Sequence, residues 1–209
     1  ADRLFDRVRH MLDAVLRRCP TVCAIGFTGQ MHGILCTDAN GHALTPLYTW
    51  QDQRAAIGER SAAAVIAEQT GHKVAAGYGL ATFYTLLRAD EIPDDTTRIC
   101  TVMDYAAARL CGKPVGIMHT TNAASLGLFD LSRGIFDVSA LERLGIDPAL
   151  LPRVTDAPET VGMYRGIPVT VPIGDNQASF FGSVSDSRTT ALANFGTGSQ
   201  ISLSSDNLP

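Results

Sequence analysis

The sequence predicts an α/β fold, and three observations point to it. Stretches with the periodicity of amphipathic helices alternate with short apolar stretches bounded by turn residues, as in α/β domains. Hydrophobic residues make up 45% of the 209 residues, which is enough for a sizeable core. The sequence contains no internal repeat or low-complexity tract, and its composition excludes a chain that is disordered throughout.

The first half of the chain is expected to contain two helices and three strands. Residues 2–18 place their apolar side chains on one helical face, and Pro20 ends this helix. The Ala-rich residues 53–69 predict a second helix, which ends before Gly71. Strands are expected at residues 22–27, 33–37 and 44–50, with a tight turn at residues 38–41 between the last two.

The second half is expected to be richer in helices. Helical segments are predicted at residues 77–90, 105–111, 136–144 and 177–184. Asp104 is placed to cap the second of these helices, and Gly112 stands at its end. Strands are expected at residues 169–173, 190–195 and 200–204, the last two forming a hairpin. The turn-rich residues 147–166 predict a border between the first group of elements and the last.

The charges and the cysteines exclude several classes of protein. The chain has 17 basic and 21 acidic residues, a formal net charge of −4 and no basic stripe, so we expect no nucleic-acid partner. No apolar stretch approaches the ~18 residues of a membrane span, so we expect no membrane partner. The five cysteines lack metal-binding spacing, and their odd number favours free thiols in a reducing, cytoplasmic compartment, most of them in the core.

The first candidate site is the segment Thr28–Gly33, which follows the strand predicted at residues 22–27. Ligands of open α/β sheets bind beyond the carboxyl ends of strands, and this segment has that position. Gln30 and His32 are neutral donors and acceptors that suit hydroxyl groups. The alternative is a turn whose polar side chains satisfy backbone groups, and the segment taken alone favours this structural interpretation.

The second candidate site is the segment Trp50–Arg54. Asp52 is placed to cap the helix that follows, which is a purely structural role. Alternatively, Trp50 packs against the apolar face of a sugar or polyol, while Asp52 and Arg54 lie near its hydroxyl groups. Both interpretations remain open at this point.

The third and fourth candidate sites are Gly174–Gln177 and Phe195–Ser199. Asp175 follows an apolar strand and is either the N-cap of the next helix or a general base that reaches a bound hydroxyl. The backbone amides of the fourth segment, with the hydroxyls of Thr197 and Ser199, suit a phosphate group. A hairpin turn explains its glycines equally well. Neither a Walker motif nor a dinucleotide-binding fingerprint is present.

Taken together, the four segments resemble the FGGY family of carbohydrate kinases, and the resemblance covers essentially the whole chain. The segments that carry it stand in the family's order: Gly29–Gly33, Trp50–Arg54, Gly174–Ala178 and Phe195–Gly198. Within the family, residues 77–82 and 121–125 are most similar to sedoheptulokinases, with xylulokinases next. Joint agreement of four segments is far more specific than any single one.

The resemblance implies an actin-like ATPase fold of the ribonuclease H-like type, and ATP-dependent transfer of the γ-phosphate to a hydroxyl of a ketose or polyol. Residues 1–183 would form an incomplete sugar-binding lobe, and residues 184–209 would begin the second lobe with a phosphate-loop hairpin. The family's first strands, which help to hold Mg²⁺, are expected before Ala1, and most of the second lobe after Pro209. The chain is therefore expected to be an internal fragment, inactive alone. A homodimer is compatible with the resemblance.

The resemblance also assigns roles to individual residues. Asp175 matches the family's catalytic base, and Asn176 matches a polar neighbour that contacts the substrate. The residues that match sugar-binding positions are Gln30, Met31, His32, Trp50 and Asp52. The residues that match the phosphate loop of the second lobe are Gly196, Thr197 and Gly198. No residue of the chain is assigned to a metal.

Two other functions are weighed against the kinase. One is a sugar-binding module without catalysis, from a degenerate or truncated kinase, although the presence of Asp175 argues against degeneration. The other is a metal hydrolase that uses His32, Asp52 and Asp175. It is the weaker hypothesis, because no two of the five histidines have the spacing of metal ligands.

Overall fold

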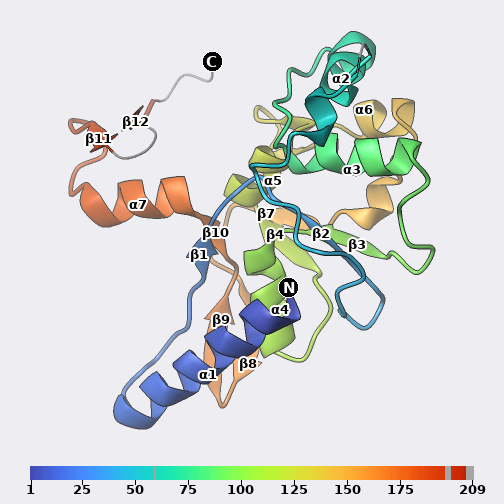
Figure 1. Cartoon of the computed structure of the whole chain (residues 1–209). Coiled ribbons are helices and arrows are strands. Elements are labelled where there is room, and N and C mark those ends of the chain that lie inside the picture. Colours follow the sequence, from blue (N-terminus) through green and yellow to red (C-terminus); the bar gives the residue numbers. More distant parts are fainter. Residues whose placement is uncertain (59, 196–198, 206–209) are drawn as a thin grey trace.

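The computed structural model of the chain is a mixed α/β structure that describes residues 1–58, 60–195 and 199–205 (Figure 1). Its α-helices are α1 (Asp2–Arg18), α2 (Ala62–Thr70), α3 (Gly79–Arg88), α4 (Val102–Leu110), α5 (Thr120–Leu126), α6 (Val138–Arg143) and α7 (Asp175–Ser183), and its short 3-10 helices are η1 (Arg54–Ala56) and η2 (Pro148–Leu150). Its strands are β1 (Thr28–Gly29), β2 (Leu35–Thr37), β3 (Arg98–Cys100), β4 (Ile117–His119), β5 (Phe129–Asp130), β6 (Ile135–Phe136), β7 (Arg153–Thr155), β8 (Thr160–Tyr164), β9 (Ile167–Thr170), β10 (Ile173–Gly174), β11 (Leu192–Phe195) and β12 (Ser199–Ser202).

The described strands are short and associate in pairs. β1 pairs with β10 and β4 pairs with β7, both in parallel, whereas β2–β3, β5–β6, β8–β9 and β11–β12 are antiparallel. A parallel bridge between Ile25 and Val169 extends the contact of β1 and β10 toward the start of both segments. An early segment and a late segment of the chain therefore run side by side in the same direction.

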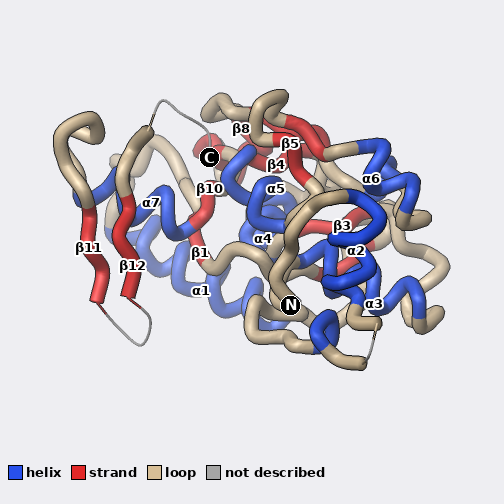
Figure 2. The backbone as a smooth tube through the Cα atoms, turned by 90° about the horizontal axis from the view of Figure 1, so that it is seen from above, coloured by secondary structure: helices blue, strands red, loops and turns tan. Residues whose placement is uncertain are grey.

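The core lies among α3, α4, α5 and the strands β2 and β3. Its largest fully buried side chains include Phe83, Tyr105, Ile34, Leu35, Leu80, Ile99 and Leu126. α1 contributes only Phe5 to the buried residues, and its Met11 is 68% exposed. Figures 1 and 2 show α7 and the hairpin β11–β12 at one side of the molecule, opposite α2, α3 and α6.

Four predicted elements are confirmed in place. The helix predicted at residues 2–18 is α1, and the helical segment at residues 77–90 contains α3. The helix predicted at residues 177–184 is α7, which begins two residues earlier than expected. The hairpin predicted at residues 190–195 and 200–204 is β11–β12, with Phe195 opposite Ser199.

Three predicted strands are wrong in extent. The strand predicted at residues 169–173 is interrupted at Pro172, which has no N–H to donate, and its residues belong to the end of β9 and the start of β10. The other two errors also have a physical reason. Within residues 22–27 only Ile25 forms a bridge, and the strand β1 lies beyond them, because its pairing is fixed by the distant segment before Asp175 rather than by local sequence. Residues 44–50 form no continuous strand. Pro46 has no N–H to donate, so this segment makes single contacts with its neighbour, such as the bridge between Tyr48 and Ile34.

The predicted helix at residues 53–69 is two helices. Arg54–Ala56 forms η1, and α2 starts anew after Ser61, whose hydroxyl accepts a hydrogen bond from the amide of Ala64. Such a side-chain cap fixes a helix start, which explains the interruption. Residues 147–166 are not a border, because they contain η2, β7 and β8, and β7 pairs with β4.

Two helix starts also differ from the prediction. Asp104 is not the cap of α4, because Thr101 holds that position and accepts from the amide of Asp104 in the first turn. Phe136 belongs to β6, and Asp137 caps the following helix α6 through the amide of Ala140. In both cases another capping residue near the predicted start competes for the position.

The five cysteines are free thiols, as predicted, but fewer lie in the core than expected. Cys36 and Cys100 are buried, whereas Cys19 and Cys23 are exposed and Cys111 is partly buried. Burial raises the pKa of Cys36 to about 11, so this thiol is protonated at neutral pH. In the described part of the chain, every helix is too short or too polar to cross a membrane.

Candidate functional site

The pairing of β1 with β10 brings the first and third candidate segments together. Gly29 and Gly174 are register partners at the ends of these two parallel strands. Gln30 and Asp175 are the next residues along each strand, so both leave the pair at the same edge. Figure 1 shows β1 and β10 side by side, with β10 leading directly into α7.

Met31 forms the contact between these two segments. It is 7% exposed, and a Cβ atom added to Gly174 would overlap its sulfur. The Met31 side chain therefore covers the glycine that precedes Asp175. Its observed role is to pack the two segments together, and a contact with sugar stays a prediction for this residue.

His32 is held by two other parts of the chain. Its backbone φ is +72°, a left-handed conformation that is uncommon outside glycine. Its amide donates to Oγ of Ser125 at 3.1 Å, and its Nδ1 lies 2.6 Å from the carbonyl oxygen of Ser125. Because a carbonyl only accepts, Nδ1 carries the hydrogen in this bond. The His32 ring also stacks on Tyr78, with ring centres 4.7 Å apart.

Two glycines, Gly77 and Gly79, allow the start of α3 to pack closely against the second candidate segment and against His32. Gly77 lies so close to the carbonyl of Trp50 that a Cβ atom there would overlap it, and a Cβ at Gly79 would lie 2.8 Å from the carbonyl oxygen of His32. The start of α3 therefore packs against both the Trp50 segment and the His32 segment. Trp50 is 52% exposed, which leaves its ring accessible beside this junction.

Asp52 is engaged within its own segment. Both carboxylate oxygens lie 3.0 Å from Nε of Arg54, and Oδ1 also accepts from the Arg54 amide. The Arg54 guanidinium stacks on the ring of Tyr48, and the hydrogen bond that it donates to Asp52 is the main cause that raises the pKa of Arg54. The predicted helix-cap role of Asp52 is wrong, because the N-cap of η1 is Gln53. The contacts of Asp52 instead order the turn that leads into η1. A sugar contact of its carboxylate stays a prediction.

Asp175 is the first residue of α7 and is not its N-cap, which is Gly174. The side chain is exposed, and its Oδ1 accepts from the amide of Asn176 at 3.0 Å. Asn176 is also exposed and lines a hollow of about 470 Å³ between α7 and β12, together with Gln200 and Ser202. The capping alternative for Asp175 is thus wrong, and the residue is free of that structural task.

The predicted phosphate-loop residues Gly196, Thr197 and Gly198 lie outside the described residues. Phe195 and Ser199, which flank them, are register partners in the hairpin. The strands on either side pair as predicted, whereas the hairpin-turn and phosphate-binding interpretations of residues 196–198 both stay predictions.

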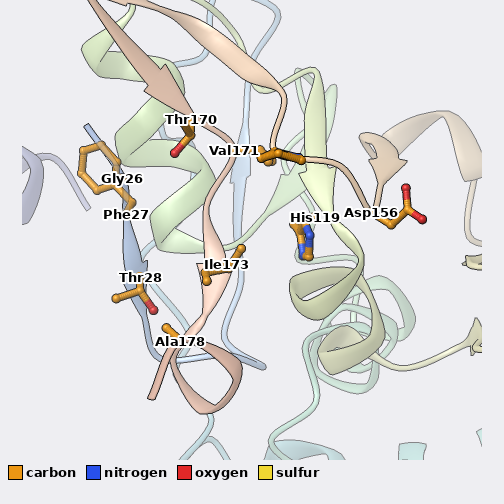
Figure 3. Close-up of a pocket in the computed structure, with 10 residues that line it drawn as sticks. Gly26, Phe27, Thr28, His119, Asp156, Thr170, Val171, Ile173 and Ala178 are labelled. Carbon is orange, nitrogen blue, oxygen red and sulfur yellow. The ribbon is translucent and has the colours of Figure 1, made fainter. Parts of the chain in front are cut away.

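A cavity of about 420 Å³ lies beside the candidate site rather than at it (Figure 3). Its lining residues are Gly26, Phe27, Thr28, His119, Asp156, Pro158, Thr170, Val171, Ile173 and Ala178. Thr28 and Ile173 belong to the paired strands β1 and β10, but no predicted site residue lines this cavity. Gln30 instead lines a groove of about 280 Å³ between α1 and α4. Gln30 and Asp175 thus leave the strand pair at the same edge, but the described site residues do not line one common pocket.

Metal chemistry finds no support in the described residues. Within residues 1–58, 60–195 and 199–205, no three His, Cys, Asp or Glu side chains are close enough together to hold a metal ion. His32 and Asp52, which the hydrolase hypothesis requires, are bound to Ser125 and Arg54 instead. The described residues therefore give no support to the metal-hydrolase hypothesis.

Comparison with known proteins decides the family. Residues 1–192 match the FGGY family of carbohydrate kinases, N-terminal domain. The chain belongs to this family. The family predicted from the four segments is therefore confirmed.

Curated relatives of this FGGY-family chain include two kinases with different substrates. It is 32% identical to a mouse (Mus musculus) protein named sedoheptulokinase, over 97% of this chain and 47% of the relative. It is 30% identical to the glycerol kinase of Aromatoleum aromaticum, over 93% of this chain and 42% of the relative. The chain thus spans about half the length of the curated relatives it matches.

A solved structure confirms the predicted fold. The ligand-bound xylulose kinase from Lactobacillus acidophilus superposes with a TM-score of 0.79, at 21% sequence identity, over 96% of this chain and 44% of that chain. At this identity the likeness establishes the fold alone. It is the α/β fold of the actin-like ATPase type that the four segments predict.

The partners of His32 are residues of the candidate site that the sequence did not indicate. Tyr78 and Ser125 lie within segments that resemble the family, but no local pattern assigns them a contact with His32. Ser125 is 93 positions away from His32 along the chain. Only the three-dimensional structure places such residues together.

Proposed function

We propose that this protein phosphorylates a hydroxyl group of a ketose or polyol with ATP. Membership of the FGGY family supports this function, as do the names of relatives that phosphorylate different sugars and polyols. The observation that carries the proposal is the register of Gly29 with Gly174. It brings the backbone of Gln30 beside that of Asp175, and hydroxyl binding and deprotonation require a polar loop and a base that lie near each other.

Asp175 is the proposed general base. In this mechanism its carboxylate accepts the proton of the sugar hydroxyl while the hydroxyl oxygen attacks the γ-phosphorus of ATP. The bond between the γ-phosphorus and the bridging oxygen breaks, and ADP leaves. The exposure of Asp175 supports this role, and so does the amide of Asn176, which orients one carboxylate oxygen.

The sugar is proposed to lie against His32 and Trp50. Nδ1 of His32 is occupied by the Ser125 carbonyl, so Nε2 is the ring nitrogen left to meet a sugar hydroxyl. Trp50 offers a half-exposed aromatic face to the apolar side of the sugar ring or chain. Asn176 lies next to the base and is the proposed neighbour that contacts the same substrate.

Residues 1–183 are proposed to be the sugar-binding lobe, and residues 184–209 the start of the second lobe, with Gly196, Thr197 and Gly198 near the phosphates of ATP. Kinases of this chemistry use Mg²⁺ to neutralise phosphate charge. The described residues hold no cluster of ligands that fits Mg²⁺, so no step of the mechanism is assigned to a metal held by them.

The test is an ADP-release assay with ATP, Mg²⁺ and a panel of sedoheptulose, xylulose and glycerol. It is run on this chain and on a version extended at both ends. Asp175→Asn is expected to lower turnover at least about 100-fold, because a general base contributes that much or more. Asp95→Asn, at an exposed carboxylate before β3, is the matched control and should leave turnover unchanged.

Two results would overturn parts of this proposal. Near-normal turnover of Asp175→Asn would remove this residue as the base. A folded, extended protein that binds a sugar but releases no ADP with any of the panel would favour the sugar-binding module without catalysis.

A further inference from the structure

One short helix, α5, is hydrogen-bonded to both halves of the candidate site. Near its end, Ser125 binds the backbone and the ring of His32. Near its start, the hydroxyl of Thr121 accepts from the amide of Gly174 at 2.9 Å, immediately before Asp175. Between them, Nδ2 of Asn122 donates to the carbonyl of Pro172 at 3.1 Å. The sugar loop and the proposed base are thus tied to the same rigid element.

The Ser125 hydroxyl both accepts and donates a hydrogen bond. It accepts from the His32 amide and donates to the carbonyl of Asn122 at 2.7 Å, and the residue is only 6% exposed. The left-handed backbone of His32 costs conformational energy, so it persists only where neighbouring contacts hold it. The hydrogen bonds that His32 donates to Ser125 are such contacts, and they fix where the imidazole ring stands.

The donor and acceptor roles of the Thr121 hydroxyl are also defined by its neighbours. The Thr121 amide donates to Nδ1 of His119 at 3.2 Å, so this nitrogen carries no hydrogen. The Thr121 hydroxyl, 3.0 Å from the same nitrogen, therefore donates to it and keeps its lone pairs for the Gly174 amide. Burial lowers the pKa of His119, which favours the neutral ring that this chain of bonds requires.

We propose that Ser125 and Thr121 are positioning residues that set the sugar loop and the base, respectively, at a fixed separation. Ser125 acts through His32 and governs sugar binding. Thr121 acts through Gly174 and governs how Asp175 is aimed at the hydroxyl that reacts. This inference rests on the proposed kinase function and gives a role to two residues to which the sequence analysis assigned none.

The kinetic test uses the extended protein with its preferred sugar. Ser125→Ala is expected to raise the sugar KM about tenfold with kcat within about twofold, because the loss affects binding. Thr121→Val, which keeps the side-chain shape, is expected to lower kcat about tenfold with KM within about threefold. Ser125→Thr restores the hydroxyl and should recover most of the lost affinity. Thr85→Val removes a hydroxyl that bonds within α3 and serves as the control.

A simple loss of stability would lower kcat in proportion to the lost folded fraction and leave KM unchanged, so kcat is given per folded enzyme, measured by circular dichroism. A raised KM in Ser125→Ala and a lowered kcat of fully folded Thr121→Val then identify positioning. The same change in both parameters for the two variants would overturn the inference, and so would failure of Ser125→Thr to recover affinity. The proposed function fails separately, if the unmodified extended protein turns over no sugar.

Amide hydrogen exchange in this chain tests the hydrogen bonds of the His32 and Gly174 amides independently of activity. In Ser125→Ala the His32 amide is expected to exchange faster than in the unmodified chain, whereas the Ile34 amide, bound to the Tyr48 carbonyl, should not change. In Thr121→Val the same acceleration is expected at Gly174 alone. Unchanged protection of His32 and Gly174 would show that α5 does not hold the two segments.

Discussion

The sulfur of Met31 lies against Gly174, so the loop that follows β1 and the turn that precedes α7 pack directly on each other. Neither residue leaves room for a larger neighbour, because Met31 is 7% exposed and Gly174 is buried. The separation between the proposed sugar loop and the proposed base therefore depends on a glycine at this position as well as on the hydrogen bonds of α5.

Replacement of Gly174 by alanine is expected to destabilise the protein. The added methyl group would overlap Met31 and lie 2.8 Å from the side-chain oxygen of Gln177, so both side chains must move. Overpacking of this kind costs about 1–3 kcal/mol in the free energy of unfolding. Urea denaturation of this chain measures the change.

The control for this prediction is Gly182→Ala in the same helix. A Cβ at Gly182 meets no described atom within 4 Å, and alanine is the better helix former, so stability should rise by about 0.5–1 kcal/mol. Equal stability of Gly174→Ala and the unmodified chain would contradict the close packing of Met31.

Asp104 predicts a pH dependence of stability. It is 2% exposed, and burial raises its pKa to about 7, while hydrogen bonds from Thr101 and Asn122 oppose the rise. The folded protein therefore holds a proton on Asp104 that the unfolded chain releases near pH 4. The contribution of Asp104 to the free energy of unfolding therefore falls as the pH rises from about 4 to about 7.

Asp104→Asn is expected to remove this loss, because the amide is neutral at every pH and can still bind Thr101. At pH 8 the variant should gain stability on the order of 4 kcal/mol over the unmodified chain, with little difference at pH 4. Denaturation curves at a series of pH values measure it, with exposed Asp95→Asn as the control. Parallel pH profiles for Asp104→Asn and the unmodified chain would contradict the prediction.

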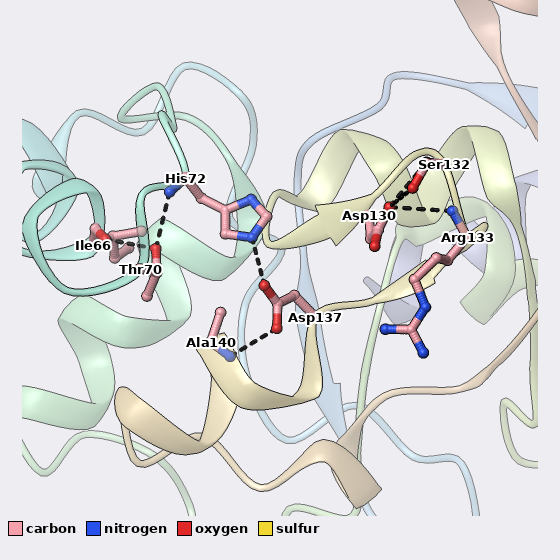
Figure 4. Close-up of polar contacts among 8 residues, drawn as sticks. All are labelled: Ile66, Thr70, His72, Asp130, Ser132, Arg133, Asp137 and Ala140. Atoms are coloured by element: carbon pink, nitrogen blue, oxygen red, sulfur yellow. Dashed lines mark hydrogen bonds and ion pairs between the residues drawn. The ribbon is translucent and has the colours of Figure 1, made fainter. Parts of the chain in front are cut away.

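His72 and Asp137 join the end of α2 to the start of α6 (Figure 4). Nε2 of His72 lies 3.0 Å from Oδ2 of Asp137, whose other oxygen accepts from the amide of Ala140. His72→Ala removes one bond and leaves the helix cap intact. Because the pair is partly exposed, the expected loss is about 0.5–1 kcal/mol in the free energy of unfolding at neutral pH.

The same pair has a defined acid dependence. The hydrogen bond from His72 is the main cause that lowers the pKa of Asp137. The stability that this carboxylate contributes is therefore present above its ordinary pKa and is lost as the pH falls through the lowered value. His72→Ala should make that acid-induced loss smaller, whereas His10→Ala, at an exposed histidine of α1, should not change it.

Local patterns predicted the elements whose ends are marked within the chain itself. The apolar face and charged flank of residues 2–18 give α1 without reference to any partner. The start of α4 was missed because Thr101 and Asp104 are both good capping residues, and only the packing of the helix against β1 and β8 selects between them. Short strands such as β4 and β5 have too few residues for a pattern.

The candidate site was predictable as a set of segments but not as a geometry. The order of the four segments identified the family and placed Gln30 and Asp175 at strand ends. What holds them cannot be inferred from spacing, because the contacts of His32 with Ser125 and of Gly174 with Thr121 join residues far apart in the sequence. His119 received no role from the sequence for the same reason, although it orients Thr121.

The stacking of His32 on Tyr78 gives the last prediction. The two rings are nearly parallel, with an angle of 14° between their planes, and an aromatic pair is worth about 0.5–1.5 kcal/mol beyond the area that it buries. Tyr78→Leu removes the stack and is expected to raise the sugar KM roughly two- to tenfold, because the imidazole of His32 is then held by Ser125 alone. Tyr78→Phe keeps the ring and removes only the hydroxyl, so it separates stacking from any hydrogen bond that the hydroxyl makes to the sugar. A KM that rises equally in both variants would assign the effect to the hydroxyl, and a KM unchanged in Tyr78→Leu would show that the stack does not position His32.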